Sequence, residues 1–571
     1  MSPSSTCYEL DSVPADPMPN CPRLPAGGAS IDQHRGVLNG SKYALVGLPV
    51  PRPRPILESG TMGYFLTAWH VVAAVLLVLI VNAAVVRKRR TPLPPGPRGW
   101  PVIGNVFDMP PSYHWKTFAT WSEQYGDLIM LKLLGQPMLI INSLAHATAL
   151  LEKRSALYSD RPHFTMAGEI VGWDQILVLL RYGSQFREYR RLMARALGSR
   201  KTVETFAPVI EAQSAQLLVR LLRDARDIPG HLREMTGSVV LMIAYGYKAQ
   251  EHDDPLIKMV QGATDQAAEV VQPGAFLVDV FPFLRYVPSW MPGAGWKRKG
   301  EAYRANMDRT SDVPHQYAKE QMAAGNAPPN FTSTMLAMSP SPADEYRIKM
   351  SAASIYTGGA DTTVSAETSL ILAMSVYPAV QKRAQAELDA VVGPDRLPTY
   401  ADLAQLPYFN ALYLEVLRWN PVVPLGVPHA VSSDDVYNGY YIPKGTIVMI
   451  NQWKMLHDPA TYADPFTFNP DRFLPKDGSE PEYDPRKIAF GFGRRICPGM
   501  YLAEPSVLMV AAMLLAVYDI ADPRSAAGVS ITPETVECTG GTISHPAPFR
   551  CSFTPRSEKA RALILALQDK A

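Results

Sequence analysis

Cysteine is scarce in this chain, with only five copies in 571 residues. None of the five stands in a C-x-x-C pair, which argues against the common zinc sites and against dithiol redox chemistry. Only three of them fall in the long part of the chain, as is typical of a domain in a reducing compartment. The five are Cys7, Cys21, Cys497, Cys538 and Cys551.

Charge is also limited. The 55 lysines and arginines exceed the 53 aspartates and glutamates by only two, and charged residues make up 19% of the chain. So small a net charge argues against general nucleic-acid binding. Hydrophobic residues make up 47% of the chain, which favours a globular body over a disordered one.

One long uncharged run lies near the start of the chain. Residues 64–86 carry no formal charge and are long enough to cross a bilayer core of about 30 Å. Arg87-Lys88-Arg89-Arg90 follows at once, and positive residues stay on the cytoplasmic side. We therefore predict a single transmembrane helix at 64–86 in the endoplasmic reticulum, with the large domain in the cytosol. A cleaved signal peptide and a buried core helix are the alternatives.

The segments on either side of this run differ in composition from the rest. Residues 1–63 are rich in proline, serine and glycine, which predicts a disordered extension that the topology above places in the lumen. The sequon at Asn39 would accept a glycan only if this extension is luminal. Residues 87–101 combine the basic run with prolines and predict a stiff hinge. Helical periodicity dominates residues 102–571, which we expect to form one large, mostly helical domain in the cytosol.

The most informative stretch reads Phe-Gly-Phe-Gly-Arg-Arg-Ile-Cys-Pro-Gly and runs from Phe490 to Gly499. Gly491 and Gly493 allow a tight turn and let backbone N–H groups approach the sulfur of Cys497. A thiolate held in this way is suited to ligate haem iron.

The residues around the cysteine strengthen this interpretation. Pro498 suits the first position of a helix, so we expect Cys497 at a helix N-terminus, where the helix dipole favours an anionic sulfur. A Rossmann phosphate loop is an alternative for the glycines, but the third glycine of that fingerprint is missing. A buried structural cysteine is the other alternative, and it would not require two glycines and two arginines before it.

The pattern Phe-Gly-x-Gly-Arg-x-x-Cys-x-Gly resembles the cysteine loop of the cytochrome P450 family of haem-thiolate monooxygenases, and the resemblance extends from Pro92 to the C-terminus. It implies a mainly α fold with small β-sheets (α+β), here preceded by the single transmembrane helix. It also implies haem b as the cofactor, with Cys497 as the axial iron ligand and Arg495 beside a haem propionate. The other haem-binding positions implied in this loop are Phe490, Gly491, Gly493 and Gly499.

A second motif, Gly-Gly-Ala-Asp-Thr-Thr, interrupts an otherwise regular helical run. Paired glycines weaken a helix by about 1 kcal/mol each, so their presence in mid-run predicts a local opening. The motif resembles the oxygen-binding kink in the family's central helix. By that resemblance Ala360 faces the haem, Thr362 hydrogen-bonds dioxygen or a water beside it, and Asp361 relays protons inward.

Glu415 and Arg418 stand three residues apart, which places opposite charges on one helical face. Glu188 and Arg191 have the same spacing, and we interpret that pair as an ordinary surface contact. Glu415 differs because apolar residues surround it. By resemblance to the family, Arg472 is the third member of a buried structural Glu-Arg-Arg triad. Removing one partner from such a network costs about 3–5 kcal/mol, so we predict that Glu415→Ala gives misfolded, haem-poor protein.

Two further positions resemble family residues that meet the haem propionates. Arg190 lies in a segment that resembles the family's Trp-x-x-x-Arg helix, with Phe186 in place of the tryptophan. Phenylalanine has no N–H donor, so only packing is expected there. His429 matches a second propionate position, with a structural histidine as the alternative.

The resemblance implies an NADPH- and O2-dependent monooxygenase that hydroxylates a lipophilic small molecule. NADPH–cytochrome P450 reductase would supply the electrons, with cytochrome b5 as a second candidate donor. The hinge and tail look most like those of fungal microsomal members, many of which act on terpenoids, polyketides or indoles of secondary metabolism. We expect a monomer. The apolar residues 276–296 and the basic residues 297–299 suit a loop that dips into a membrane, with core packing as the alternative.

Three other functions stay open at this point. A xenobiotic-detoxifying monooxygenase would have the same chemistry on other substrates. An isomerase or dehydratase of the same fold would need no electrons, and a haem-based carrier or sensor would only bind a gas. The pair of Asp361 and Thr362 favours oxygen activation over the isomerase or dehydratase, and a measurement of NADPH consumption would separate the carrier or sensor.

Overall fold

The computed structural model describes residues 91–568 apart from 273, 339, 477 and 479, together with five residues between 69 and 77. Contacts divide the chain into two units, residues 1–88 and 89–571. The predicted extension at 1–63, with Asn39, lies outside the described residues, as does most of the predicted anchor at 64–86. The five described anchor residues are helical and exposed.

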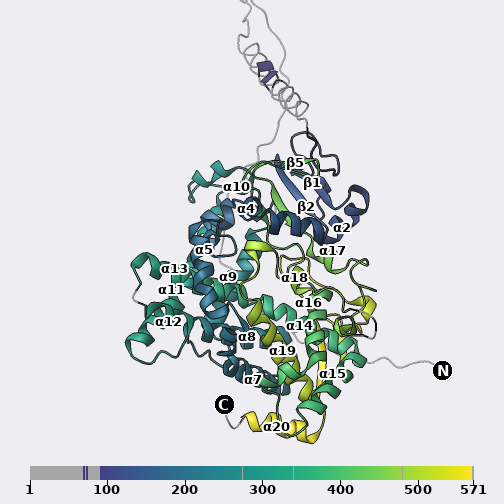
Figure 1. Ribbon diagram of the computed structural model, residues 1–571. Helices are drawn as coiled ribbons and strands as arrows, with labels where there is room; N and C mark the ends of the chain where they lie inside the picture. The colour runs from purple at the N-terminus through teal and green to yellow at the C-terminus, as the bar shows by residue number, and fades with distance from the viewer. Residues whose placement is uncertain are drawn as a thin grey trace, which may run out of the picture. The chain divides into compact units, whose positions relative to one another are not determined.

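Helices make up most of the second unit (Figure 1). Their bounds are α2 (His114–Tyr125), α3 (Leu144–Ala147), α4 (Ser155–Tyr158), α5 (Ser184–Leu197), α6 (Arg200–Glu204), α7 (Ala207–Arg223), α8 (Ile228–Tyr245), α9 (Pro255–Val270), α10 (Leu277–Val280), α11 (Gly295–Ala323), α12 (Phe331–Leu336), α13 (Pro342–Gly359), α14 (Thr362–Val376), α15 (Pro378–Val391), α16 (Pro407–Trp419), α17 (Gln452–Leu456), α18 (Arg486–Ala489), α19 (Met500–Val517) and α20 (Glu558–Gln568).

The strands form small sheets, and together with the helices they confirm the mainly α fold with small β-sheets. In the four-stranded sheet the order is β1-β2-β6-β3, with β2 and β6 parallel and the other neighbours antiparallel. Two antiparallel pairs, β4-β5 and β7-β8, lie apart from it. The bounds are β1 (Leu128–Leu133), β2 (Gln136–Ile141), β3 (His429–Ala430), β4 (Asp435–Tyr437), β5 (Tyr440–Ile442), β6 (Ile447–Ile450), β7 (Tyr518–Ser525) and β8 (Phe549–Pro555).

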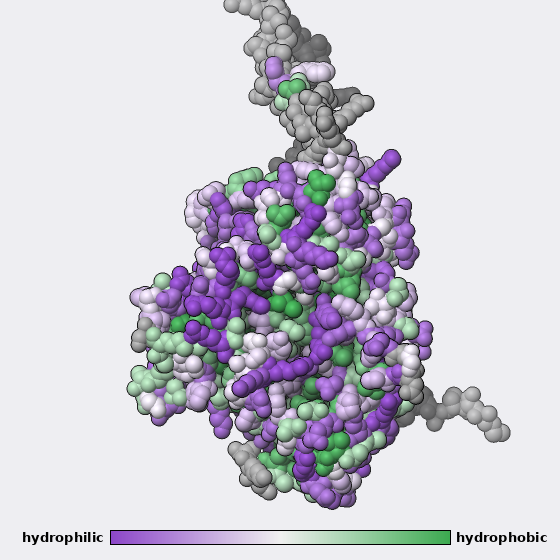
Figure 2. All heavy atoms as spheres, in the orientation of Figure 1, coloured by the Kyte–Doolittle hydropathy of each residue, from purple (hydrophilic) through white to green (hydrophobic). Residues whose placement is uncertain are grey.

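The core of the second unit is built around α19. This helix packs against α7, α14, α15 and α16, and nearly all of its side chains are buried. Among the described residues, α19 is long and apolar enough to cross a membrane, and so is the bent run of α13, α14 and α15 if it is counted as one span. The burial of α19 inside the domain gives its apolar composition a structural reason. The surface in view is mostly hydrophilic, with scattered hydrophobic residues (Figure 2).

The predicted opening in the long helical run is present. Helix α13 ends at Gly359 and α14 begins at Thr362, so Ala360 and Asp361 lie between them. A Cβ atom placed on Gly359 would lie 3.0 Å from the side chain of Val240 in α8. The glycine therefore allows α8 to pass close to the break.

Candidate haem-binding and active site

The cysteine loop connects α18 to α19 and is closed by its own backbone. The Cys497 N–H donates a hydrogen bond to the Phe490 carbonyl oxygen at 2.9 Å. Gly491 and Gly493 have φ angles of +78° and +56°, which side chains rarely adopt. A Cβ atom on Gly493 would also lie 2.1 Å from the Leu151 carbonyl oxygen, so this position excludes any side chain.

The prediction that the helix after Cys497 begins at Pro498 is wrong. Pro498 and Gly499 form a turn, and α19 begins at Met500 with Gly499 as its N-cap, because the first helical hydrogen bonds are accepted by the Gly499 carbonyl. Burial raises the pKa of the Cys497 thiol above its usual value, and the Gly499 N–H, the Arg190 guanidinium and the Met500 N–H offset only part of this rise. The helix start thus still directs N–H groups at the sulfur, as ligation by a thiolate requires.

The predicted basic residues bind backbone carbonyl oxygens near this loop. Arg190 donates to the Ile496 carbonyl at 2.7 Å, immediately before the cysteine. Arg495 donates to the carbonyls of Ser159 at 2.8 Å and Leu180 at 2.7 Å. These contacts fix the direction of each guanidinium group and leave other N–H groups for a ligand.

Sequence reasoning missed Arg161, a further buried arginine on this side. It donates to the carbonyls of Val427 and Pro428 at 2.8 and 2.7 Å, next to His429. Burial and the nearby Arg495 lower its pKa well below the usual value. Its signal in the sequence is weak, since an arginine between an aspartate and a proline is typical of an exposed turn.

His429 is buried and makes a single defined hydrogen bond. Its Nδ1 lies 2.7 Å from the Tyr158 carbonyl oxygen, so Nδ1 carries the proton of the neutral ring. Burial and the neighbouring Arg161 and Arg495 lower the pKa of His429 far below its usual value. Nε2 can therefore donate to a carboxylate only if that carboxylate also draws a proton onto the ring.

These groups fit the haem that the family pattern implies. Burial lowers the pKa of Arg190 and lowers that of Arg495 to about 10, and Arg161 is affected in the same direction. Among the described residues, Asp160 is the carboxylate that acts on Arg161 and Arg495, and it is itself bonded to Arg181 at 2.5 Å. Buried cations that repel one another call for an anion, and the two carboxylates of haem are suited to supply it.

Phe186, which replaces the expected tryptophan, has a defined contact. The guanidinium carbon of Arg495 lies 3.9 Å from the centre of its ring. A cation over an aromatic face is attracted by the ring quadrupole. The ring therefore does more than fill space, because it supports an arginine of the cysteine loop.

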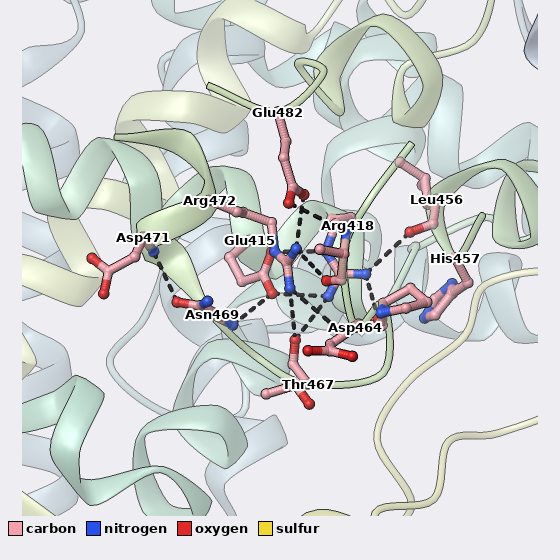
Figure 3. A network of polar contacts seen from close by, with 12 residues as sticks. Glu415, Arg418, Leu456, His457, Asp464, Thr467, Asn469, Asp471, Arg472 and Glu482 are labelled. Carbon is pink, nitrogen blue, oxygen red and sulfur yellow. Dashed lines mark hydrogen bonds and ion pairs between the residues drawn. The ribbon is translucent and has the colours of Figure 1, made fainter. Parts of the chain in front are cut away.

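The structure brings Glu415, Arg418 and Arg472 together (Figure 3). Arg418 Nε lies 2.7 Å and Arg472 Nε lies 3.1 Å from the same carboxylate oxygen of Glu415. The backbone N–H of Asn469 donates to the other oxygen at 2.7 Å. Arg472 reaches outward to Glu482 at 2.7 Å. The network ties α16 to the segment around η7 (Pro470–Phe473).

At the break between α13 and α14, Thr362 and Asp361 point to different partners. The Thr362 hydroxyl donates to the Gly358 carbonyl at 2.8 Å, so its lone pairs stay available as acceptors. The Asp361 carboxylate lies 3.0 Å from His545 Nε2 and 3.8 Å from Arg233 Nε. Neither partner was expected from the sequence, because no local motif links them to Asp361.

Comparisons with known proteins agree with this geometry. The family model for cytochrome P450 matches residues 94–543. Cytochrome P450 monooxygenase 208 of Postia placenta is 51% identical over 500 residues, covering 87% of this chain and 97% of the relative. Cytochrome P450 monooxygenase claR of Ampulloclitocybe clavipes is 41% identical over 505 residues, covering 88% and 93%. Cytochrome P450 monooxygenase ppsD of Aspergillus oryzae is 40% identical over 487 residues, covering 84% and 92%.

Proposed function

Since this chain belongs to the cytochrome P450 family and is a monooxygenase of the fungal type, we propose that it hydroxylates a lipophilic small molecule with O2 and NADPH-derived electrons. The observation that carries the proposal is the cysteine loop. Its glycines and its closing hydrogen bond fix the backbone of the loop, and the N–H groups of Gly499 and Met500 lie at the Cys497 sulfur, an arrangement that would suit an iron-bound thiolate.

In this proposal one set of residues binds the haem and another set delivers protons. Cys497 would ligate the iron, and Arg161, Arg190, Arg495 and His429 would hold the haem carboxylates. When bound, a thiolate-ligated haem supplies the cleavage of the O–O bond of dioxygen. Other residues of the chain manage protons.

Thr362 and Asp361 would provide these protons. The Thr362 hydroxyl is oriented by the Gly358 carbonyl and can accept a hydrogen bond from a water or an acid beside it. Asp361 would bring each proton from the solvent side, because its carboxylate is only partly buried. A non-monooxygenase isomerase or dehydratase of this fold, like a haem-based carrier or sensor, would not need such a pair.

We also propose that the enzyme is held at the endoplasmic reticulum membrane by a single helix at 64–86, with the catalytic domain in the cytosol. The segment between α9 and α11 supports contact with a membrane. Leu277, Phe283, Tyr286 and Trp290 are all exposed there, and Trp290 is 77% exposed. Core packing does not account for exposed apolar side chains, whereas a loop that dips into lipid does.

The substrate class rests on the family and on its fungal members. We propose a secondary metabolite such as a terpenoid, polyketide or indole, with xenobiotic detoxification as the alternative. Electrons would come from NADPH–cytochrome P450 reductase. Comparing the metabolites of a host with and without the active chain tests this choice, since a pathway product that gains one oxygen only with the chain identifies the substrate.

The first test is the ferrous–carbon monoxide difference spectrum of membranes that contain the chain. We expect the red-shifted band of thiolate ligation, and its loss in Cys497→Ala. Cys551→Ala is the matched control, because Cys551 is also a buried thiol with a raised pKa but lies on β8. A band typical of neutral or histidine ligation in the unaltered protein, or equal loss in both variants, would contradict the proposal.

A further inference from the structure

Asp361 is the N-cap residue of α14, yet its side chain makes no cap hydrogen bond. An aspartate at this position normally accepts from the backbone N–H two or three residues further on, here Thr363 or Val364. The carboxylate instead turns to His545 and Arg233. A specific contact is therefore holding it away from its ordinary local partner.

His545 lies in a segment whose position is fixed by other contacts. The Ser365 hydroxyl of α14 donates to the Ser544 carbonyl at 2.5 Å, and the Ser544 N–H donates to the Val422 carbonyl at 2.8 Å. The His545 N–H donates to the Thr539 hydroxyl at 3.0 Å. These bonds fix the backbone at Ser544 and His545 beside α14 without any contribution from the Asp361 carboxylate. The family match ends at residue 543, so His545 is not part of the matched pattern.

The charges around Asp361 come from three elements. Burial raises the pKa of the Asp361 carboxyl, but His545 and Arg233 of α8 outweigh it, so the pKa is lowered. Asp265 of α9 faces the same cluster, and burial raises its pKa, assisted by the charge of Asp361. The side chains of His545 and Asp361 are 20% and 22% exposed, so the contact lies within reach of solvent.

We propose that His545 is a positioning residue that keeps the Asp361 carboxylate from capping α14 and so leaves it able to deliver protons toward Thr362. This inference rests on the proposed monooxygenase function. In one cycle a solvent proton binds an oxygen of the Asp361 carboxylate, the acid releases it on the Thr362 side, and the carboxylate returns to His545. Only a proton moves, and no electrons or other bonds change.

The first test measures structure and needs no catalysis. Without the imidazole, as in His545→Ala, the carboxylate is expected to fall back on the N–H groups of Thr363 and Val364. A new cap should slow their hydrogen exchange about fivefold, as a mass-spectrometric measurement on the haem-loaded chain can show. Unchanged exchange of these amides would overturn the proposal.

The second test measures proton delivery with reductase, NADPH and O2 as the probes and no added substrate. His545→Ala should slow NADPH consumption about tenfold and increase the slowing caused by D2O, since a missing positioned acid makes proton transfer limiting. The acidic limb of its pH profile should move to higher pH, because Asp361 loses the partner that lowers its pKa. His545→Gln keeps an N–H donor of similar reach and should stay within about twofold of the unaltered enzyme.

Two controls separate positioning from a structural effect. Ser365→Ala removes one of the bonds that position the segment but keeps the imidazole, so it should change the D2O effect much less than His545→Ala does. In an Asp361→Asn background, His545→Ala should have no further effect on turnover. Additive losses, or an equal change in Ser365→Ala, would overturn the proposal. Failure of the proposed function is distinguishable, since the unaltered protein would then lack the thiolate carbon monoxide band while hydrogen exchange still reports on Asp361.

Discussion

Among the described residues, two glutamates have no exposed surface, and the surroundings of the two carboxyl groups favour opposite charge states. Glu415 on α16 accepts hydrogen bonds from the Arg418 guanidinium and the Asn469 backbone N–H, and it forms an ion pair with Arg472. Glu367 on α14 accepts one hydrogen bond, from the Thr236 hydroxyl at 3.1 Å, and its other oxygen has no partner. Burial raises the pKa of Glu367 far above its usual value, so that side chain is a neutral acid.

The difference shows that burial does not decide the role of a carboxylate. Where cations and N–H groups converge, a buried charge becomes a brace between segments of chain. Where they are missing, the group takes up a proton to avoid the cost of a bare charge. Glu367 follows Thr362 by five residues on the same helix, so α14 carries a buried acid close to the proposed proton-relay pair at its start.

The largest expected effect is on the braced glutamate. Glu415→Ala leaves two buried arginines without their shared anion, which costs about 3–5 kcal/mol. We expect little haem-loaded protein, measured as the thiolate carbon monoxide band per milligram of purified chain.

Glu482→Ala is the control for this prediction. It removes a half-buried carboxylate from Arg472 at the outer end of the same network but leaves the Glu415 contacts in place. We expect a smaller loss of haem loading. Normal haem content in Glu415→Ala would contradict the view of this network as the brace.

The braced region is also the part that the sequence describes best. The i, i+3 spacing of Glu415 and Arg418 and the apolar residues around them are local features, and they predicted a buried pair in need of a third partner. The cysteine loop and the glycine break are likewise short motifs. Both motifs can be recognised in the sequence because their backbone geometry depends on residues close by in the chain.

The parts that sequence reasoning missed are contacts between distant segments. His545 and Asp361 are 184 positions apart, and only packing of the late segment onto α14 brings them together. The burial of Arg161 likewise depends on a distant segment, because its guanidinium group donates to the carbonyls of Val427 and Pro428. The predicted start of α19 at Pro498 was wrong because proline is tolerated at the first position of a helix but does not require a helix to begin there.

The second prediction concerns the pH dependence that a buried neutral acid creates. The pKa of Glu367 is higher in the folded than in the unfolded chain, so its stabilising contribution is full below about pH 4.5 and is lost as pH rises. The slope is about 1.4 kcal/mol per pH unit for one proton. Glu367→Gln should remove this fall, so its thermal midpoint should exceed that of the unaltered chain increasingly from pH 5 to pH 8.

Glu345→Gln gives the matched control for this pH experiment. Lys319 lies 2.7 Å from Glu345 and lowers its pKa, so the contribution of Glu345 is present above the unfolded pKa and lost as pH falls. Glu345→Gln should therefore differ from the unaltered chain in thermal midpoint at pH 7, and this difference should change little between pH 7 and pH 8. A parallel pH profile for Glu367→Gln and the unaltered chain would mean that Glu367 is charged in the fold.

The third prediction isolates the one hydrogen bond that Glu367 receives. Thr236→Val removes the hydroxyl with little change in volume and leaves the acid without a donor. We expect a loss of about 1 kcal/mol in the free energy of unfolding, seen as a lower thermal midpoint. Thr236→Ser keeps the hydroxyl and should lose less. Equal losses would point to packing of the threonine methyl group instead of the hydrogen bond.

The smallest effect is expected where the spacing of the braced pair recurs at the surface. Arg191 lies 2.6 Å from Glu188, as close as Arg418 lies to Glu415, but the two side chains are 64% and 39% exposed. Water screens such a pair and competes for both partners, so Glu188→Ala should change stability by less than about 0.5 kcal/mol and leave haem loading unaltered. The thermal midpoint measures the stability, and the carbon monoxide band measures the haem loading. A loss comparable to that of Glu415→Ala would show that spacing and not burial makes the brace, because spacing is the property that the two pairs share.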